Sequence, residues 1–271
     1  MIALTYLSAI RFSGTDAGDF LHNQLSADVL ALAPDESVFA CYCEPKGRVL
    51  ALMLVSRRGD DYYAIMSESL LSSVAGRLRI YVMRAKVTVE TLDECTVSGL
   101  RSKEAAPQSP ALVAIVKVPG SSDLLTLTTG AAVYKTDPAL ENAWKVSELQ
   151  RGITWLGPET SAQFLPQMLG YDSLGAVNFR KGCYPGQEII ARTHYLGKVK
   201  RHPRLLCTSA VICPDPLDKI QILGNDKSYA AIVTDYATRE DSGGYLYVIT
   251  RMDPDLTAEQ IEYQGQIAPL L

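Results

Sequence analysis

The residue types best suited to chemistry are concentrated between positions 180 and 192, where the sequence reads RKGCYPGQEIIAR. Gly182 and Gly186 permit a sharp turn, and Pro185 suits the first position of a helix. Apolar residues follow and form one face of that helix, so Cys183 is expected beside a helix N-terminus. The pattern predicts a reactive or ligand-holding cysteine, and the alternative is a buried structural cysteine in a tight turn.

Positive charge surrounds this cysteine in the sequence. Arg180 and Lys181 precede it, and together with the positive end of the helix they favour a thiolate over a thiol. Between Arg180 and Arg204 the chain holds seven Lys or Arg and one acid, a local charge of +6 in a protein whose formal net charge is −4. A basic island on an acidic protein suggests an anionic partner such as a polycarboxylate, a phosphate ligand or RNA, and a solvated helix face is the alternative.

Other familiar catalytic signatures are missing from the chain. The sequence contains no GxGxxG, Walker A, GxSxG or HExxH motif, which leaves nucleotide-fold, P-loop, serine-hydrolase and zincin functions without supporting residues. His194 is close enough to Cys183 in sequence to suggest a Cys/His pair, but such pairs are defined by geometry. The six cysteines are too few for a disulfide framework, and Cys41 and Cys43 lack zinc-site spacing, so reduced thiols and no metal site are expected.

The first half of the chain alternates helices and strands. An amphipathic helix is expected after residues 13–16, with apolar residues at three- and four-residue steps up to Val29. Further elements follow: a hairpin of residues 37–43 and 48–55 around a turn at 44–47, a strand over 62–66, a helix from Ser67, and a strand over 86–92. This order predicts an α+β module of ferredoxin-like type, in which helices pack on one face of a mixed sheet.

The second half changes character towards the C-terminus. Short strands are expected within residues 94–133, around an Ala/Pro/Ser-rich surface loop at 102–111, and a helix is expected over 138–149. Four spaced strands are predicted at 204–209, 218–223, 228–238 and 245–252, the last two joined by a hairpin turn at 239–244. The prediction is an α+β body over residues 1–202, which can consist of two interleaved modules, followed by a small antiparallel β-barrel or sandwich over residues 203–271.

Composition and hydropathy place the chain among ordinary globular proteins. It has 271 residues, of which 47% are hydrophobic and 21% are charged. The longest uninterrupted apolar run is Val49–Val55, far below the roughly 20 residues needed to cross a bilayer. The N-terminal segment lacks the basic and apolar regions and the cleavage site of a secretory signal. We therefore expect a cytoplasmic protein without a membrane partner.

The stretch KGCYPGQE at positions 181–188, with Arg192 downstream, closely resembles the YgfZ-like family of folate-binding, tRNA-modification and iron-sulfur-maturation proteins. This family is related to the glycine-cleavage T-protein, an aminomethyltransferase. Supporting stretches lie in the family's order at residues 14–28, 45–48, 84–87 and 163–167. The resemblance covers roughly residues 3 to 204 and implies a folate-binding α+β body that is closed by a C-terminal barrel.

The resemblance also implies which residues bind folate. A pterin requires aromatic stacking and polar hydrogen bonds, and its glutamate tail requires Lys or Arg. In the family a tryptophan precedes the segment that matches residues 148–153, and here that residue is Trp144, for which a role as a core anchor of its helix is the alternative. A second aromatic contact is not cleanly placed, because Tyr6 and Leu7 occupy its region. The predicted cofactor-binding residues are Trp144, Lys181, Gly182, Tyr184, Gln187 and Arg192, with Cys183 as the functional thiol.

One departure from the T-protein separates the possible functions. T-proteins carry a catalytic aspartate in an acidic pair after the turn that matches Lys46–Arg48, whereas this chain has Ala51 and Leu52 there. Without that carboxylate, turnover as an aminomethyltransferase is disfavoured. The leading interpretation is a tetrahydrofolate-binding accessory protein without turnover of its own, which supports iron-sulfur enzymes such as the radical enzymes that thiolate tRNA.

Two alternatives remain open from the sequence. One is a folate-dependent one-carbon transferase that uses a different acid or base. The other is an RNA-binding module that acts through the basic island, which is not favoured because the basic stretch shows no aromatic platform. An iron-sulfur cluster at Cys183 would be transient and shared with another molecule, since one thiolate falls short of the usual four ligands.

Overall fold

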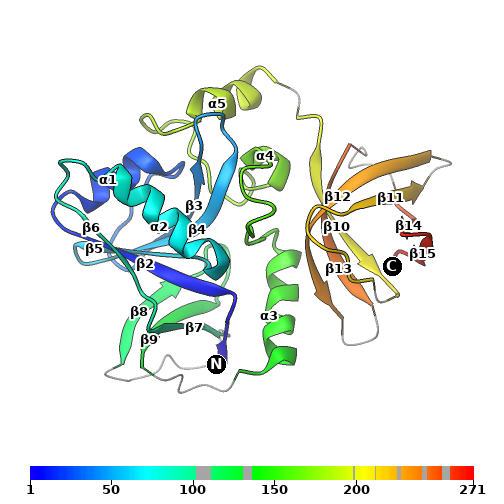
Figure 1. Ribbon diagram of the computed structural model, residues 1–271, viewed down its shortest axis with the longest axis horizontal. Coiled ribbons are helices and arrows are strands. Elements are labelled where there is room, and N and C mark those ends of the chain that lie inside the picture. The colour runs from blue at the N-terminus through cyan, green and yellow to red at the C-terminus, as the bar shows by residue number, and fades with distance from the viewer. Residues whose placement is uncertain are drawn as a thin grey trace.

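Three β-sheets and five α-helices form the described part of the chain, which comprises residues 1–101, 111–130, 136–197, 199–210, 212–224, 227–239, 243–251 and 257–271 of a computed structural model. Figure 1 shows the two sheets of the N-terminal half on one side, helix α3 along the middle, and the third sheet on the other side. The predicted α+β combination of β-sheets and helices is confirmed, and the helices are few. The predicted surface loop at 102–111 lies, except for its last residue, outside the described residues.

The first sheet has the strand order β3-β4-β5-β2-β6. Its strands are β2 (Leu7–Ser13), β3 (Ser37–Cys43), β4 (Val49–Arg58), β5 (Asp61–Ser67) and β6 (Thr88–Thr91). The hairpin of β3 and β4 forms as predicted, and Gly47 takes a positive φ of 77° in its turn. Two helices accompany the sheet, α1 (Ala17–Gln24) and α2 (Leu71–Ile80), the latter preceded by the 3₁₀ turn η1 (Glu68–Leu70).

Helix α1 is shorter than predicted. The apolar spacing extends to Val29, but the helix ends at Gln24 and Leu25 is extended, with φ −110° and ψ 156°. Leu25 leaves the helix because it forms an antiparallel bridge with Tyr42 of β3. Leu25 and Val29 are still fully buried, so the apolar pattern identified core positions but not the helix end.

The second sheet has the order β1-β7-β9-β8 and lies beside helix α3. Its strands are β1 (Ile2–Ala3), β7 (Cys95–Leu100), β8 (Leu112–Lys117) and β9 (Leu124–Thr129). Helix α3 (Pro138–Gln150) begins at the predicted residue, because the Asp137 carboxylate accepts hydrogen bonds from the Ala139 and Leu140 amides and Pro138 occupies the first turn. Two short helices follow, α4 (Pro166–Leu169) and α5 (Gln187–Tyr195).

The C-terminal sheet is antiparallel, but a closed barrel is not confirmed. Its strand order is β10-β13-β12-β11-β14-β15. The strands are β10 (His202–Thr208), β11 (Lys219–Gly224), β12 (Lys227–Thr238), β13 (Gly244–Thr250), β14 (Gln260–Tyr263) and β15 (Gln266–Pro269). The two ends of the sheet meet at a single bridge between Thr208 and Leu270, because β15 is too short to form a ladder along β10.

The apolar core is divided between the two parts of the chain. A large cluster contains buried residues from Leu4 to Ile190, joined by Ile249 from β13. A second cluster is formed entirely by residues between Leu206 and Ala268. A boundary near residue 202 remains a prediction. In the described residues, no helix has both the length and the apolar composition required to span a bilayer.

Candidate functional site

The cysteine turn precedes helix α5, but the helix begins later than predicted. Gly186 occupies the N-cap position with a positive φ of 84°, and α5 starts at Gln187, so Pro185 is not in the first helical turn. A β-carbon at Gly186 would lie 2.5 Å from the Glu44 carbonyl oxygen in the β3–β4 turn. The left-handed glycine allows the cysteine turn to pack against that hairpin, which places Cys183 four residues before the helix.

Lys181 is buried beneath the turn. Its ammonium donates hydrogen bonds to the carbonyl oxygens of His22 and, at 2.6 Å, of Leu25, both at the C-terminal end of α1. The ammonium also lies 5.1 Å from the centre of the Tyr184 ring. Burial lowers the pKa of Lys181 to about 8. The side chain that the sequence assigned to an anionic ligand therefore caps the end of α1 and anchors the turn.

Cys183 is exposed on this anchored turn. Cys41 and Cys43, in contrast, are buried in β3, where a hydrogen bond to Cys41 and burial raise the pKa of Cys43. Among the described residues, no group of three or more His, Cys, Asp or Glu side chains is placed to hold a metal ion. A single exposed thiol does not by itself fit a resident iron-sulfur cluster, so further ligands would have to come from another molecule.

The other predicted residues of the turn have different surroundings. The Tyr184 ring is buried, and burial raises the pKa of its hydroxyl. The Gln187 amide donates to the Lys181 carbonyl oxygen at 3.2 Å and so closes the turn. Gly182 and Arg192 are exposed. The turn thus has an interior side made by Lys181 and Tyr184 and an outer side where Cys183 and Arg192 face solvent.

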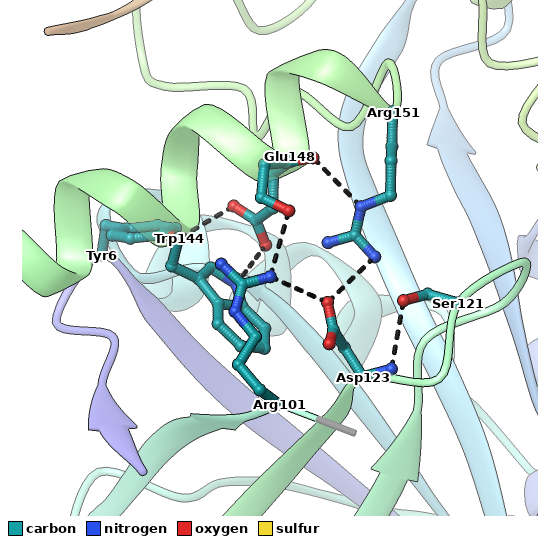
Figure 2. Close-up of polar contacts among 8 residues, drawn as sticks. Tyr6, Arg101, Ser121, Asp123, Trp144, Glu148 and Arg151 are labelled. Carbon is teal, nitrogen blue, oxygen red and sulfur yellow. Dashed lines mark hydrogen bonds and ion pairs between the residues drawn. The ribbon is translucent and has the colours of Figure 1, made fainter. Parts of the chain in front are cut away.

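Trp144 lies in a different place, on α3, where it is completely buried (Figure 2). Its indole nitrogen donates to the Glu148 carboxylate at 3.1 Å, and the Tyr6 hydroxyl donates to the other carboxylate oxygen at 2.8 Å. Burial raises the pKa of Glu148 to about 7, although the hydrogen bond from Tyr6 opposes this increase. Tyr6 lies in the region where the sequence analysis looked for a second aromatic residue in contact with folate. In the structure it is a hydrogen-bonding partner of the Glu148 carboxylate.

Two arginines and an aspartate complete the polar cluster beside Trp144 (Figure 2). The Arg101 guanidinium lies 4.4 Å from the centre of the Trp144 ring and pairs with Asp123 at 3.0 Å. Arg151 reaches the same carboxylate at 3.5 Å. A β-carbon on Gly99 would lie within 2.7 Å of the indole, so the ring also packs directly on the β7 backbone. This geometry corresponds to the alternative interpretation of Trp144, in which the ring anchors its helix in the core.

A cavity of about 670 Å³ lies between α3 and strands β12 and β13 of the C-terminal sheet. Asn142 and Ala143 contribute from α3, and Arg239 and Tyr245 contribute from the C-terminal sheet and its turn. The Arg239 guanidinium lies 5.8 Å from the centre of the Tyr245 ring and donates to the Cys207 sulfur at 2.8 Å. The volume and the mixture of aromatic, amide and cationic groups suit a small organic anion.

The predicted cofactor-binding residues do not line this cavity in the described part of the chain. The residues that do were missed because they come from two regions that the sequence does not relate. Positions 139, 142, 143 and 146 follow the spacing of one helical face, which is the available signal on α3. Arg239 was identified as the start of a hairpin turn, but nothing in the sequence indicates that it faces α3.

Comparison with known proteins identifies the relatives of this chain. No protein-family model matches it. An uncharacterised protein of Haemophilus influenzae is 30% identical over 202 residues, which cover 74% of this chain and 70% of that protein. The tRNA-modifying protein YgfZ of Colwellia psychrerythraea is 25% identical and covers 98% of this chain and 89% of its own, and that of Escherichia fergusonii is 27% identical with 90% and 83% covered. The chain belongs to the YgfZ-like family.

A solved structure supports the relation of this YgfZ-like chain to the T-protein fold. The glycine-cleavage aminomethyltransferase T of Bartonella henselae superimposes with a TM-score of 0.75, covering 99% of this chain and 83% of that protein. The sequence identity is 13%, so the likeness concerns the fold alone. Ala51 and Leu52, the residues that the sequence analysis predicted in place of the T-protein acidic pair, are buried in β4.

Proposed function

We propose that this protein is a tetrahydrofolate-binding accessory of tRNA modification, which supports iron-sulfur enzymes such as those that thiolate tRNA. The observation that carries the proposal is the exposed Cys183 on a turn whose neighbouring side chains are fixed to the interior. A thiol presented this way is accessible to another molecule and held in position. The names of the YgfZ relatives supply tRNA modification as the context. The unpaired thiols suit the reducing cytoplasm.

The cavity beside α3 is the site that we assign to tetrahydrofolate. The Tyr245 ring offers a stacking surface for a pterin or aminobenzoate ring, and the Asn142 side chain offers amide hydrogen bonds. Arg239 would pair with a carboxylate of the glutamate tail. Bound folate supplies one-carbon chemistry to a reaction, while these residues bind and orient it. Cys183 lies outside the residues that line the cavity, so folate binding and the thiol are separable elements.

The second function, a folate-dependent one-carbon transferase, is favoured by the T-protein fold. It would require an acid or base other than the missing T-protein aspartate, because Ala51 and Leu52 cannot transfer protons. Formation of methylene-tetrahydrofolate from a small amine by the pure protein distinguishes this enzyme from an accessory protein.

The test combines calorimetric titration with tetrahydrofolate under anaerobic conditions and thionucleoside analysis of tRNA from cells that lack the protein. Saturable binding is expected, and Arg239→Gln should weaken it at least tenfold because a charge-assisted hydrogen bond is lost. Cys183→Ser should bind folate normally but fail to restore thiolated tRNA in the cells. Cys213→Ser is the matched control, since Cys213 is also exposed, and it should restore both properties.

Each part of the proposal has its own contradicting result. Absence of tetrahydrofolate binding would remove the folate role. Normal thiolated tRNA in cells that carry Cys183→Ser would remove the role of the thiol. Equal loss with Cys213→Ser would show that cysteine replacement, and not the position of Cys183, causes the defect.

A further inference from the structure

An aromatic cluster lies at the C-terminal end of α5. The rings of Phe179 and His194 are stacked, with centroids 3.8 Å apart and planes at 14°. Tyr195 meets His194 edge-on at 4.8 Å, at an angle of 80°. These three rings could not be recognised from the sequence as one aromatic platform, because Phe179 precedes the cysteine turn and the other two rings follow it. The turn folds back so that residues on both of its sides come together.

The cluster is open to solvent. Tyr195 is 62% exposed and the neighbouring Leu196 is 84% exposed, and His194 is exposed as well. Because the three rings contact one another, they form a contiguous exposed patch, and such a patch, unlike a single exposed side chain, indicates a surface that another molecule covers. Figure 1 shows α5 at the edge of the N-terminal half, away from α3 and from the C-terminal sheet. This face is therefore separate from the cavity assigned to folate.

Positive charge accompanies the rings. Arg180 follows Phe179 directly, Arg192 lies on α5, and both side chains are exposed. In the described part of the chain, neither guanidinium forms an ion pair. Exposed cations without carboxylate partners favour an anionic ligand, and their position beside stacked rings favours one that also carries flat aromatic groups.

We infer that Phe179, His194 and Tyr195, with Arg180 and Arg192, form a binding face for the unpaired bases of an RNA loop. Unpaired bases stack on exposed aromatic rings while Arg and Lys contact the phosphates, and this combination is typical of single-stranded RNA recognition. The inference deepens the proposed function, on which it rests, by naming the surface that contacts RNA. Cys183 precedes the nine-residue α5 and the rings lie at its end, so a bound loop would extend along the helix towards the thiol.

The experiment measures binding of the full chain to a fluorescein-labelled RNA hairpin with an unpaired loop, by fluorescence anisotropy. A blunt duplex with the same stem is the comparison. Tighter binding to the hairpin is expected, and Tyr195→Ala should weaken it about 5- to 150-fold, since stacking of one base contributes about 1–3 kcal/mol. Tyr195→Phe retains the ring and should bind like the wild type.

Charge variants test the contribution of the exposed arginines to RNA binding. Arg192→Gln should weaken binding and lower the slope of log affinity against log salt by about 0.7, which is the loss of one phosphate contact on a single strand. Lys117→Gln removes an exposed cation from β8, far from α5 in Figure 1, and should change neither quantity.

Three results would overturn the inference: no binding of the hairpin, equal affinity for hairpin and duplex, or unchanged affinity in Tyr195→Ala. A face that docks a protein partner instead of RNA would give the first result. Tetrahydrofolate titration of the same variants separates this failure from that of the proposed function, because Tyr195→Ala should bind folate normally whether or not RNA binds.

Discussion

The regions around helices α3 and α5 contain the side chains considered for function, and their surroundings are opposite. Around α3, Trp144 and Glu148 are enclosed and hydrogen-bonded to each other, and the neighbouring Arg101 and Arg151 both form ion pairs with Asp123. Around α5, Cys183 and Tyr195 are exposed. The comparison shows that residue type alone does not mark a binding surface. What distinguishes the two regions is whether the protein itself satisfies the group.

Replacing Trp144 by alanine is expected to have the largest effect. The ring is fully buried against β7 and the Arg101 guanidinium, so its removal leaves a cavity and should lower the free energy of unfolding by about 3–5 kcal/mol. Urea unfolding followed by circular dichroism measures this loss. Tyr195→Ala, the exposed counterpart on α5, should change stability by no more than about 0.5 kcal/mol. Similar losses in both variants would contradict the distinction between the two helices.

Glu148→Gln tests the enclosed carboxylate through the dependence of stability on pH. Burial raises the pKa of Glu148 to about 7, whereas an unfolded glutamate titrates near 4.5. The folded state therefore binds more protons in this window, and the contribution of Glu148 to stability is present below pH 4.5 and is lost as pH rises through 7. The glutamine variant lacks this loss, so its stability relative to wild type should improve by up to about 3 kcal/mol between pH 4.5 and pH 8.

The same unfolding measurement at a series of pH values checks this expectation. Tyr6→Phe sharpens it, because removing the hydroxyl that donates to Glu148 should raise the pKa of the carboxyl further and move the pH-dependent loss to higher pH. A stability difference between Glu148→Gln and wild type that is constant over this range would show that Glu148 is solvated. The side chains around α3 would then be open to solvent like those around α5.

The local part of the fold was predictable from the sequence. Periodicity and turn residues predicted the β3–β4 hairpin, helix α3 and the strands β10 to β13, because each depends on neighbouring residues. The end of α1 was not, because Leu25, whose amide still donates to the Leu21 carbonyl oxygen, turns into an extended conformation and forms a bridge to Tyr42, a residue 17 positions away. The closed barrel failed for a similar reason, since closure depends on the meeting of β10 and β15.

The candidate site was only partly predictable. The cysteine turn was identified from its residues, and Cys183 is exposed on it, while its role as a functional thiol remains a prediction. Lys181 was placed on the wrong side of that turn, because its cationic type says nothing about two carbonyl oxygens at the end of α1. The aromatic platform was missed because Phe179 and His194 are 15 residues apart and their stacking depends on the fold of the turn between them.

Lys181→Met gives the smallest of these effects and tests whether the α5 region contains an enclosed component of its own. Methionine retains most of the side-chain volume but leaves the carbonyl oxygens of His22 and Leu25 without their donor. Hydrogen bonds from a charged group contribute about 1.5–3 kcal/mol, so we expect a loss of about 2 kcal/mol in the free energy of unfolding. Arg192→Met, on the outer side of the same region, should change stability by less than about 0.5 kcal/mol. Equal losses of stability in both variants, or no loss in either, would contradict the fixed interior side of the turn that presents Cys183. In that case only the region around α3 would contain side chains that the protein itself encloses and binds.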